Sequence, residues 1–423
     1  MFRRGNALST MEALERSPNR AKSLMTPTLP PLHLAARMSR LGTETAFEVL
    51  ARAKALEAQG KSIIHLEIGE PDCDTPKNVV AAGVEALRGG WTHYGPAAGQ
   101  PEARQVVADY VARTRGVKVG ADEVVIVPGG KPILLYAMTS LIERGDEVLC
   151  PNPAYPIYES LVNFVGGTSV PVPIREENGF ALDPDDLISR LTPRTKMVVL
   201  NSPANPTGGV TPQAALREVL AALASRPDVW ILSDEIYSRL LYDGVQHFSP
   251  LQDPAVRDRV ILLDGWSKTY AMTGWRMGYG VMRPDLAVMF GKLMINSNSC
   301  TASFSQRAGM EALRGDQSSV DAMRNEFDRR RKRMVQLLNE IPGVKCHLPV
   351  GAFYVFPNVK SFGIKAAELQ GRLLQEAGLA CLAGTAFGAH GEGYLRFSYA
   401  TSMATIEEGV RRLAGLLKTL PHR

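Results

Sequence analysis

The chain has 423 residues, of which 45% are hydrophobic and 22% are charged. This balance is typical of a globular protein with a sizeable core, and the length fits two or three domains. The formal net charge is only +5 and no long basic run occurs, so nothing in the composition indicates nucleic-acid binding. A local positive site for a small anion fits this charge balance better.

The cysteines, histidines and apolar runs indicate which compartment, metal and membrane the protein can be expected to use. The five cysteines include no Cys-x-x-Cys pair, and their odd number predicts reduced thiols in a cytoplasmic protein. The seven histidines show no metal-ligand spacing, so no metal site is expected. No apolar stretch approaches the roughly 20 residues of a membrane span, so no membrane partner is expected either.

The start of the chain resembles an extension more than a signal peptide. It carries several arginines and prolines, and glutamates at positions 12 and 15, with no apolar core before a cleavage site. A flexible extension is therefore predicted over residues 1–33. An amphipathic organelle-targeting segment is the alternative.

Helical spacing begins after a candidate cap at Thr43-Glu44-Thr45. Apolar residues recur at helical intervals from Ala46 to Leu56. A short strand is predicted next, over Ile63–Ile68, and it leads into the turn Gly69-Glu70-Pro71-Asp72.

Residues 122–282 show a different pattern, in which short β-branched runs alternate with helical segments. The seven runs are Val124–Val127, Glu147–Cys150, Thr168–Ile174, Met197–Leu200, Val229–Leu232, Val260–Leu263 and Trp275–Val281. This alternation predicts a mainly parallel sheet covered by helices on both faces, with ligands bound beyond the carboxyl ends of its strands. A long charged helix is predicted from about Glu311 to Glu340, and the remaining C-terminal part reads as mixed α/β.

The first of the seven runs, Val124–Val127, leads directly into a glycine turn, Val127-Pro128-Gly129-Gly130-Lys131-Pro132. Glycines let a backbone approach a ligand, N–H groups at a helix start bind anions, and Pro132 fits a first helical turn. Gly130 and Lys131 are therefore candidates for a phosphate site. A tight strand-to-helix turn without a ligand is the alternative.

Polar and aromatic side chains follow three further strands. Tyr155 lies just beyond one, Asn205 lies in an Asn-Pro-Thr-Gly turn, and Asp234 and Tyr237 follow a buried run. A carboxylate at the end of a buried strand is costly without a cationic partner, so Asp234 predicts a bound cation. The alternatives are a packing tyrosine, an ordinary turn and a helix-capping aspartate.

One arginine, Arg396, interrupts the apolar, strand-like run Gly393–Ser398. An unpaired charge in such a run is unstable, so an anionic partner is expected. A structural salt bridge is the alternative.

The apolar run that ends at Leu263 stops abruptly at Asp264-Gly265, which leaves the next residues in a loop. This loop holds Ser267, Lys268 and, eight residues on, Arg276. A hydroxyl and a guanidinium can both bind a phosphate, and a lysine beside them is a candidate Schiff-base amine. For the Ser-Lys pair alone, a solvated loop lysine is the alternative.

These motifs, in this order, resemble those of class I/II aminotransferases, enzymes of the aspartate aminotransferase fold that depend on pyridoxal 5'-phosphate (PLP). The stretch Asp264–Gly278 is similar to the family's lysine signature, Ser-hydrophobic-Ser-Lys and then Gly-hydrophobic-Arg-hydrophobic-Gly. Gly265 and Trp266 replace the commoner Ser and Phe, and the lysine and the phosphate ligands stay in place. The resemblance runs from about residue 40 to the C-terminus.

The resemblance implies that Lys268 is the catalytic residue and binds PLP covalently. It implies that the PLP phosphate is held by Gly130, Lys131, Ser267 and Arg276. For the ring, it implies stacking by Tyr155, pairing of the ring nitrogen with Asp234, and bonds from Asn205 and Tyr237 to the phenolic oxygen. Tyr94 is similar to a tyrosine that reaches the phosphate in the other subunit's site, which implies a homodimer with shared sites.

For the substrate, the resemblance implies that Arg396 clamps the α-carboxylate and that the backbone of Gly69 approaches it. In one branch of the family, a lysine at the position of Lys131 meets the distal carboxylate of an acidic substrate. The alternatives for Lys131 are a phosphate ligand and a solvent-facing side chain.

The implied fold is α/β: a large domain with a mainly parallel seven-stranded sheet, and a smaller α/β domain. The PLP-binding domain is expected over residues 76–309, and the small domain over 34–75 and 310–423. The implied function is ping-pong transfer of an amino group between an L-amino acid and a 2-oxo acid, with aspartate or glutamate as one partner. Two alternatives stay open: another PLP reaction on this fold, such as a β-lyase, and a PLP-binding regulator with a DNA-binding domain.

Overall fold

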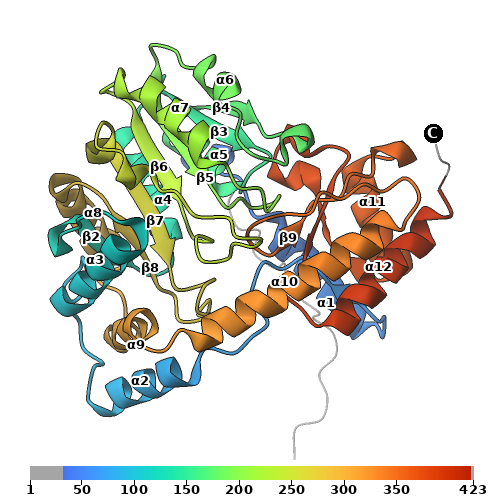
Figure 1. Ribbon diagram of the computed structural model, residues 1–423, viewed down its shortest axis with the longest axis horizontal. Coiled ribbons are helices and arrows are strands. Elements are labelled where there is room, and N and C mark those ends of the chain that lie inside the picture. Colours follow the sequence, from blue (N-terminus) through green and yellow to red (C-terminus); the bar gives the residue numbers. More distant parts are fainter. Residues whose placement is uncertain (1–31, 421–423) are drawn as a thin grey trace, which may run out of the picture. The chain divides into compact units, whose positions relative to one another are not determined.

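The structure is a computed structural model that describes residues 32–420, of which residues 37–420 belong to one compact unit (Figure 1). Nearly all of the predicted N-terminal extension lies outside the described residues. The boundaries expected between a large and a small domain stay predictions. Within residues 32–420, no helix combines the length and the apolar character that crossing a bilayer requires.

The described part of the chain contains twelve α-helices. They are α1 (Thr45–Ala58), α2 (Lys77–Arg88), α3 (Pro101–Arg115), α4 (Lys131–Leu141), α5 (Ile157–Val165), α6 (Pro184–Ile188), α7 (Gln213–Ala224), α8 (Pro284–Ser297), α9 (Ser303–Arg314), α10 (Ser318–Asn339), α11 (Ala366–Arg372) and α12 (Met403–Leu417).

All seven predicted strands form, and one sheet contains them. They are β2 (Val124–Val127), β3 (Glu147–Asn152), β4 (Thr168–Pro173), β5 (Thr195–Asn201), β6 (Trp230–Asp234), β7 (Val260–Gly265) and β8 (Gly278–Val281). Their order is β2-β8-β7-β6-β5-β3-β4. Neighbours from β4 through β7 pair in parallel, while β8 runs antiparallel to both β7 and β2. This confirms the mainly parallel seven-stranded sheet.

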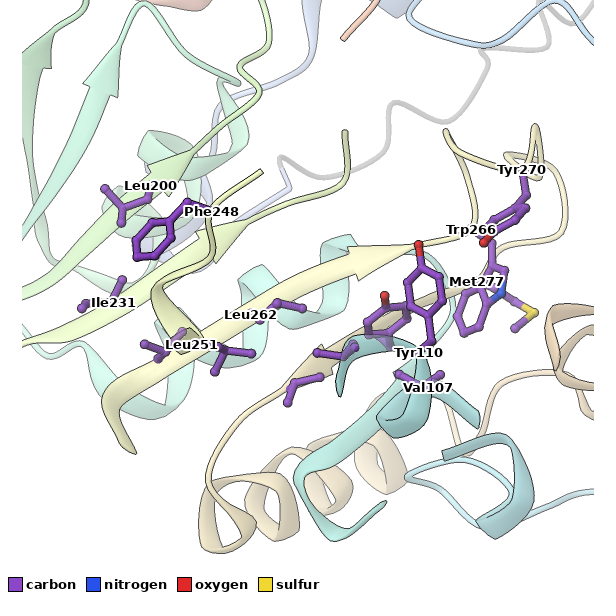
Figure 2. Close-up of a cluster of buried hydrophobic side chains, with 14 of the residues drawn as sticks. Val107, Tyr110, Leu200, Ile231, Phe248, Leu251, Leu262, Trp266, Tyr270 and Met277 are labelled. Carbon is purple, nitrogen blue, oxygen red and sulfur yellow. The ribbon is translucent and has the colours of Figure 1, made fainter. Parts of the chain in front are cut away.

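Both faces of this sheet are buried. Successive side chains of a strand point to opposite faces, so each strand contributes to a cluster on either side. In β2, Val125 and Val127 join a cluster with side chains of α4, α5 and α8. Val124 and Ile126 join a second cluster with side chains of α3 and α7, part of which Figure 2 shows. Helices therefore cover both faces, as the alternation of strands and helices predicts.

Two smaller sheets lie outside the seven-stranded one. β1 (Ile64–His65) pairs in parallel with β10 (Leu379–Ala380), and β12 (Leu395–Ser398) lies between β11 (Leu382–Ala383) and β9 (Tyr354–Val355). Side chains from α10 and α12 share a hydrophobic cluster with these strands. The prediction of a strand over Ile63–Ile68 was too long, because only two of its residues pair with β10.

The single long helix predicted from Glu311 to Glu340 is wrong, since the chain breaks between α9 and α10. Gly315 is extended, with φ −75° and ψ −168°. The side-chain amide of Gln317 donates to the carbonyls of Ala312 (2.9 Å) and Gly315 (3.0 Å), which satisfies carbonyl groups at the end of α9. The break lets α9 pack beside α2 while α10 packs on α12 (Figure 1).

The topology gathers the chemistry at one edge of the large sheet. Since β2, β3, β5, β6 and β7 point the same way, their carboxyl ends share an edge, and β8 begins at that edge. Every predicted motif that follows one of these strands therefore lies there.

Candidate active site

The turn between β2 and α4 is shaped by its glycines. Gly129 has φ +80°, and a Cβ at this position would clash with the guanidinium of Arg276. A Cβ on Gly278 would lie 2.7 Å from the backbone nitrogen of Gly130. The turn and the start of β8 therefore touch, and α4 opens directly after them with Pro132 in its first turn, as predicted.

Arg276 is held over this turn by an unusual backbone. Its φ is +53°, a left-handed conformation that costs a non-glycine residue roughly 1–2 kcal/mol. Its Nη1 donates to the carbonyl of Thr273 at 2.8 Å, and the side chain is exposed. The structure thus places the predicted phosphate-binding arginine beside Gly129, on the open side of the helix start.

Lys268 follows β7 in a turn that large aromatic side chains anchor. Trp266 and Tyr270 are buried on either side of it, and Figure 2 shows them next to Met277. The indole nitrogen of Trp266 donates to the carbonyl of Gly309 at 2.8 Å. Ser267 is half-buried beside the lysine. The replacement of the family's Phe by Trp266 therefore adds an anchor to this turn.

The amine of Lys268 donates to the carbonyl of Gly69, which brings two predicted site residues together. Burial, with a smaller contribution from the positive charge of Arg396, lowers the pKa of Lys268 to about 8 against the opposing effect of Glu70. A lysine in this state is available as a neutral nucleophile near neutral pH.

Asp234 ends β6 as a buried carboxylate with no cation beside it among its hydrogen-bond partners in the described chain. Its Oδ2 accepts from the hydroxyl of Tyr158 at 2.6 Å, and its Oδ1 accepts from the backbone N–H of Ile236 at 3.2 Å. Burial raises the pKa of Asp234 to about 6, since these bonds offset only part of the desolvation.

Arg396 lies in β12 with only 3% of its surface exposed. Its Nη2 donates to the carbonyl of Glu67, and its Nη1 donates to Oδ1 of Asn205 at 3.2 Å. Among the described residues, nothing accepts a hydrogen bond from its Nε. The guanidinium lies 4.6 Å from the ring centre of Tyr354 and 5.0 Å from that of Phe387. It is a buried cation without a carboxylate partner in these contacts.

Two pairs of tyrosines complete the interior of the site. The hydroxyls of Tyr237 and Tyr354 lie 2.8 Å apart, and a Cβ on Gly69 would clash with the Tyr354 hydroxyl. The ring of Tyr155 packs edge-on against that of Tyr158, with centres 5.7 Å apart. The glycine at position 69 therefore leaves room for the chain to pass beside the lysine and the tyrosine pair.

Lys131 and Tyr94 are exposed, as Arg276 is. Lys131 pairs with Glu44, with 2.6 Å between Nζ and Oε2, and half of its side chain is exposed. Glu44 precedes α1 but makes no side-chain cap bond, so the cap predicted there does not involve its carboxylate. Tyr94 is 89% exposed.

Comparison with known proteins agrees with this geometry. Residues 61–413 match the family described as aminotransferase class I and II. The chain belongs to this family. An aspartate aminotransferase of Pyrococcus horikoshii is 39% identical over 387 residues, which cover 91% of this chain and 97% of the relative. A probable aspartate/prephenate aminotransferase of Aquifex aeolicus is 37% identical, with 92% and 99% covered. The crystal structure of the Rhizobium meliloti aspartate aminotransferase superposes with a TM-score of 0.88 at 35% identity, covering 92% of this chain and 100% of that one.

This aminotransferase is PLP-dependent, and the residues at the sheet edge fit that cofactor. The buried carboxylate of Asp234 has a raised pKa and would gain a cationic partner in a protonated ring nitrogen. The glycine turn before α4 and Arg276 form a cradle that any Cβ at Gly129 would fill. The half-buried Lys268 has the lowered pKa that a covalent amine needs.

Sequence reasoning missed three tyrosine and glutamate contacts of the site. Tyr158 binds Asp234 and lies three residues after Tyr155, close to the start of α5. Tyr354 lies in β9, in a short apolar run that resembles any core strand. Glu44 was expected only as part of a helix cap. The periodicity of a sequence signals burial, and these contacts depend on packing between distant elements.

A buried ion network below the site was also missed. Arg115 of α3 donates from Nε to Glu235 at 3.0 Å and from Nη2 to Asp264 at 2.7 Å, and His247 contacts Glu235 at 2.7 Å. Burial alone would raise the pKa of Glu235, but His247 and Arg115 lower it to about 2. The network ties α3 to the ends of β6 and β7, next to Asp234 and the lysine turn.

Proposed function

We propose that this aminotransferase exchanges an amino group between an L-amino acid and a 2-oxo acid in a ping-pong cycle, with aspartate or glutamate as one partner. The observation that carries this combines a half-buried amine, that of Lys268 on the carbonyl of Gly69, with a buried guanidinium, that of Arg396, which has no carboxylate among its described partners. Lys268 has a pKa of about 8, and Arg396 lies close enough to lower it while keeping Nε without a partner. The printed names of the relatives, which include aspartate, support the choice of an acidic partner.

Each residue of the site has a task in this proposal. Arg396 would bind the α-carboxylate through its free Nε edge, and Asn205 would keep the guanidinium in plane through the bond at 3.2 Å. The backbone of Gly69 passes beside the same space. This fixes the α-carbon of the substrate next to the amine of Lys268, where a neutral lysine can accept the α-proton.

The cofactor would be held by the strand ends. Gly130, Ser267, Arg276 and the backbone N–H of Lys131 would bind the phosphate at the start of α4, and the Lys131 amine stays with Glu44. Bound PLP supplies an electron sink for the bonds at the α-carbon. Asp234 would keep a proton on the ring nitrogen, with Tyr158 orienting its carboxylate at 2.6 Å.

The other ring contacts come from three side chains on separate elements. Asn205 and Tyr237 would bind the phenolic oxygen, and Tyr155 would cover the ring face. Tyr158 and Tyr354 hold Tyr155 and Tyr237 in orientation, through an edge-on ring contact and a hydroxyl pair.

The test is a single half-reaction without an acceptor. The PLP-loaded enzyme is mixed in turn with glutamate, aspartate, alanine, an aromatic amino acid and a cysteine S-conjugate, which carries a leaving group on its β-carbon, and the 2-oxo acid and ammonia are measured. The proposal predicts one equivalent of 2-oxo acid per active site, no ammonia, and a response to aspartate or glutamate. Repeated turnover with release of ammonia and pyruvate would instead indicate a β-lyase.

We also propose a homodimer with shared active sites. Tyr94 is 89% exposed, and exposed apolar surface that is gathered in a patch is typical of an interaction site. Beside it lies a cavity of about 670 Å3 lined in part by Trp91 and Arg307. On α8, Val288 and Ile295 are also more than 60% exposed.

Complementation between two inactive variants tests this proposal. Subunits carrying Tyr94→Phe are mixed with subunits carrying Lys268→Ala. If Tyr94 acts across the interface, a mixed dimer has one site with both lesions and one site with neither, so activity above both parents is expected. Activity no greater than that of the parents would refute the shared site.

We place the enzyme in the cytoplasm on the basis of its thiols. All five cysteines are free, and Cys150, Cys346 and Cys381 are buried in the core, where an oxidising compartment offers them no partner. Cell fractionation with an antibody to the chain tests this location, and recovery outside the soluble cytoplasmic fraction would contradict it.

A further inference from the structure

Glu44 and Lys131 form an ion pair between two elements that are far apart in the sequence. The amine of Lys131, at the first residue of α4, lies 2.6 Å from Oε2 of Glu44, just before α1. The exposed fractions of the two side chains are 50% and 23%. The pair is therefore open to solvent, and to a ligand, on the lysine side.

The chain holds Glu44 in this place by contacts on its N-terminal side. Arg40 donates from Nε to the carbonyl of Asn163 at 2.7 Å, and the backbone N–H of Gly42 donates to the hydroxyl of Ser160 at 2.9 Å. Both acceptors belong to α5. The carboxylate of Glu44 makes no cap bond to α1, so it is directed to Lys131 and not to its own helix.

The pair also borders the site itself. The amine of Lys131 lies 6.0 Å from the ring centre of Tyr155. Burial raises the pKa of Tyr155, and the charge of Glu44 raises it further. The same carboxylate contributes, after burial and other charges, to the pKa of Lys268 and of Arg396. The charge of Glu44 therefore acts on the lysine and on the arginine of the site.

On the basis of the proposed transamination, we propose that Glu44 is a specificity-determining residue. It occupies, from within the chain, the place at Lys131 that the distal carboxylate of an acidic substrate would take. With Glu44 in place, the subsite presents a neutral ion pair to a donor with an uncharged side chain. An acidic partner binds by displacing Glu44 from Lys131.

This exchange answers a requirement of the ping-pong cycle. Both partners bind in turn to one site, so a lysine without a counter-ion would favour the acidic partner and disfavour an apolar side chain beside an uncompensated cation. A half-exposed ion pair is weak, so a substrate carboxylate can replace one of its members at little cost. Glu44 thus lets the same subsite accept an acidic and a neutral side chain.

The test compares binding of succinate and butyrate to the PLP-loaded enzyme by isothermal titration calorimetry. The two acids have four carbons each, and only succinate carries a second carboxylate. In Glu44→Gln, succinate should bind about two- to fivefold more tightly, the scale of a half-exposed ion pair, while butyrate binds as before. Glu48→Gln is the matched control, because it removes the same charge one turn further along α1, at an exposed position. It should change neither affinity.

The double variant Glu44→Gln, Lys131→Gln tests whether Lys131 is the cation that binds the second carboxylate of succinate. The gain for succinate should be absent in it, because the gain depends on a lysine that Glu44 has released. In parallel, kcat/KM for aspartate relative to alanine should rise in Glu44→Gln by a similar factor. Thermal unfolding of each variant verifies that the fold is intact.

Three outcomes would overturn the inference. Unchanged succinate affinity in Glu44→Gln means that the glutamate does not compete, and weaker binding means that it positions Lys131. An equal gain in Glu48→Gln means that only long-range charge matters. The half-reaction of the wild-type enzyme separates the two proposals: if it forms no 2-oxo acid, the proposed function fails, and if it does while Glu44→Gln shows no gain, only this inference fails.

Discussion

Two neighbouring carboxylates, Asp234 and Glu235, are both buried at the end of β6, yet their pKa values are shifted in opposite directions. Burial raises the pKa of Asp234 to about 6, because its partners are a hydroxyl and a backbone N–H. Burial acts on Glu235 as well, but His247 and Arg115 lower its pKa to about 2. Glu235 is therefore paired with cations within the chain, whereas its neighbour Asp234 has no cationic partner among its described contacts.

The arginines repeat this contrast. Arg115 is buried between two carboxylates, whereas Arg396 is buried with a carbonyl, an amide and a free Nε. A buried ion that is paired within the chain supports the fold, and one that lacks a partner is expected to bind a ligand. The edge of the sheet thus divides into a supporting network and a binding site.

The largest effect is expected at Lys268. Lys268→Ala should abolish turnover, because it removes the amine that is proposed to hold PLP and to accept the α-proton. Steady-state assay of the PLP-loaded variant measures this, with Lys345→Ala as the control, since that lysine is 79% exposed. Full transamination by Lys268→Ala would end the assignment.

Removing a member of the supporting network should affect stability first. Arg115→Ala leaves Glu235 and Asp264 buried without their cation, and the free energy of unfolding should fall by about 3–5 kcal/mol. Arg396→Ala removes a cation that lacks a carboxylate partner, so the free energy of unfolding should fall much less in this variant. Its KM should rise for every donor. Urea denaturation and kinetics of both variants test this, and equal destabilisation would remove the distinction between the two arginines.

Asp234→Ala should slow abstraction of the α-proton by about a hundredfold or more, the usual scale for losing a preorganised charge. PLP should still bind, because the phosphate cradle and Lys268 are intact. Stopped-flow measurement of the half-reaction with an α-deuterated donor reports this step. An unchanged rate would mean that Asp234 does not act on the cofactor.

The raised pKa of Asp234 makes a signed prediction for the cofactor-free protein. Its pKa is 3.8 for an exposed carboxyl and about 6 in the fold, so the unfolded chain loses its proton first as pH rises. The free energy of unfolding should therefore fall by about 3 kcal/mol between pH 4 and 7 through this group. Asp234→Asn should lack this part of the pH dependence. If the two curves run parallel, the carboxylate is paired in a way the structure does not contain.

The smallest effect is expected at Lys131. Loss of a fully formed charge-assisted bond to an acidic substrate would cost about 1.5–3 kcal/mol. The side chain is half-exposed and paired with Glu44, so the loss should be smaller. Lys131→Ala should lower kcat/KM for aspartate relative to alanine by a factor that corresponds to only about 0.2–1 kcal/mol of transition-state free energy. Equal losses for both donors would assign the lysine to the cofactor.

The sequence predicted most of the fold, and the meeting of the candidate site residues at one edge of the sheet, because both depend on local patterns. The β-branched runs placed all seven strands of the sheet, and the residues just past them meet at its edge. It did not predict the break at Gly315, where packing of α9 on α2 overrides a continuous helical pattern. It also missed the partner of Lys131 and the role of Tyr158, since these depend on how separate elements pack together.

Every role proposed for this edge of the sheet depends on Lys268 as the residue that holds PLP. Borohydride reduction of the PLP-loaded enzyme, followed by proteolysis and mass spectrometry, identifies that residue. We expect one cofactor adduct per chain, on Lys268, and its loss when the enzyme is first treated with an amino donor and no acceptor. An adduct on another lysine, or an adduct that amino donors do not remove, would contradict this role of Lys268.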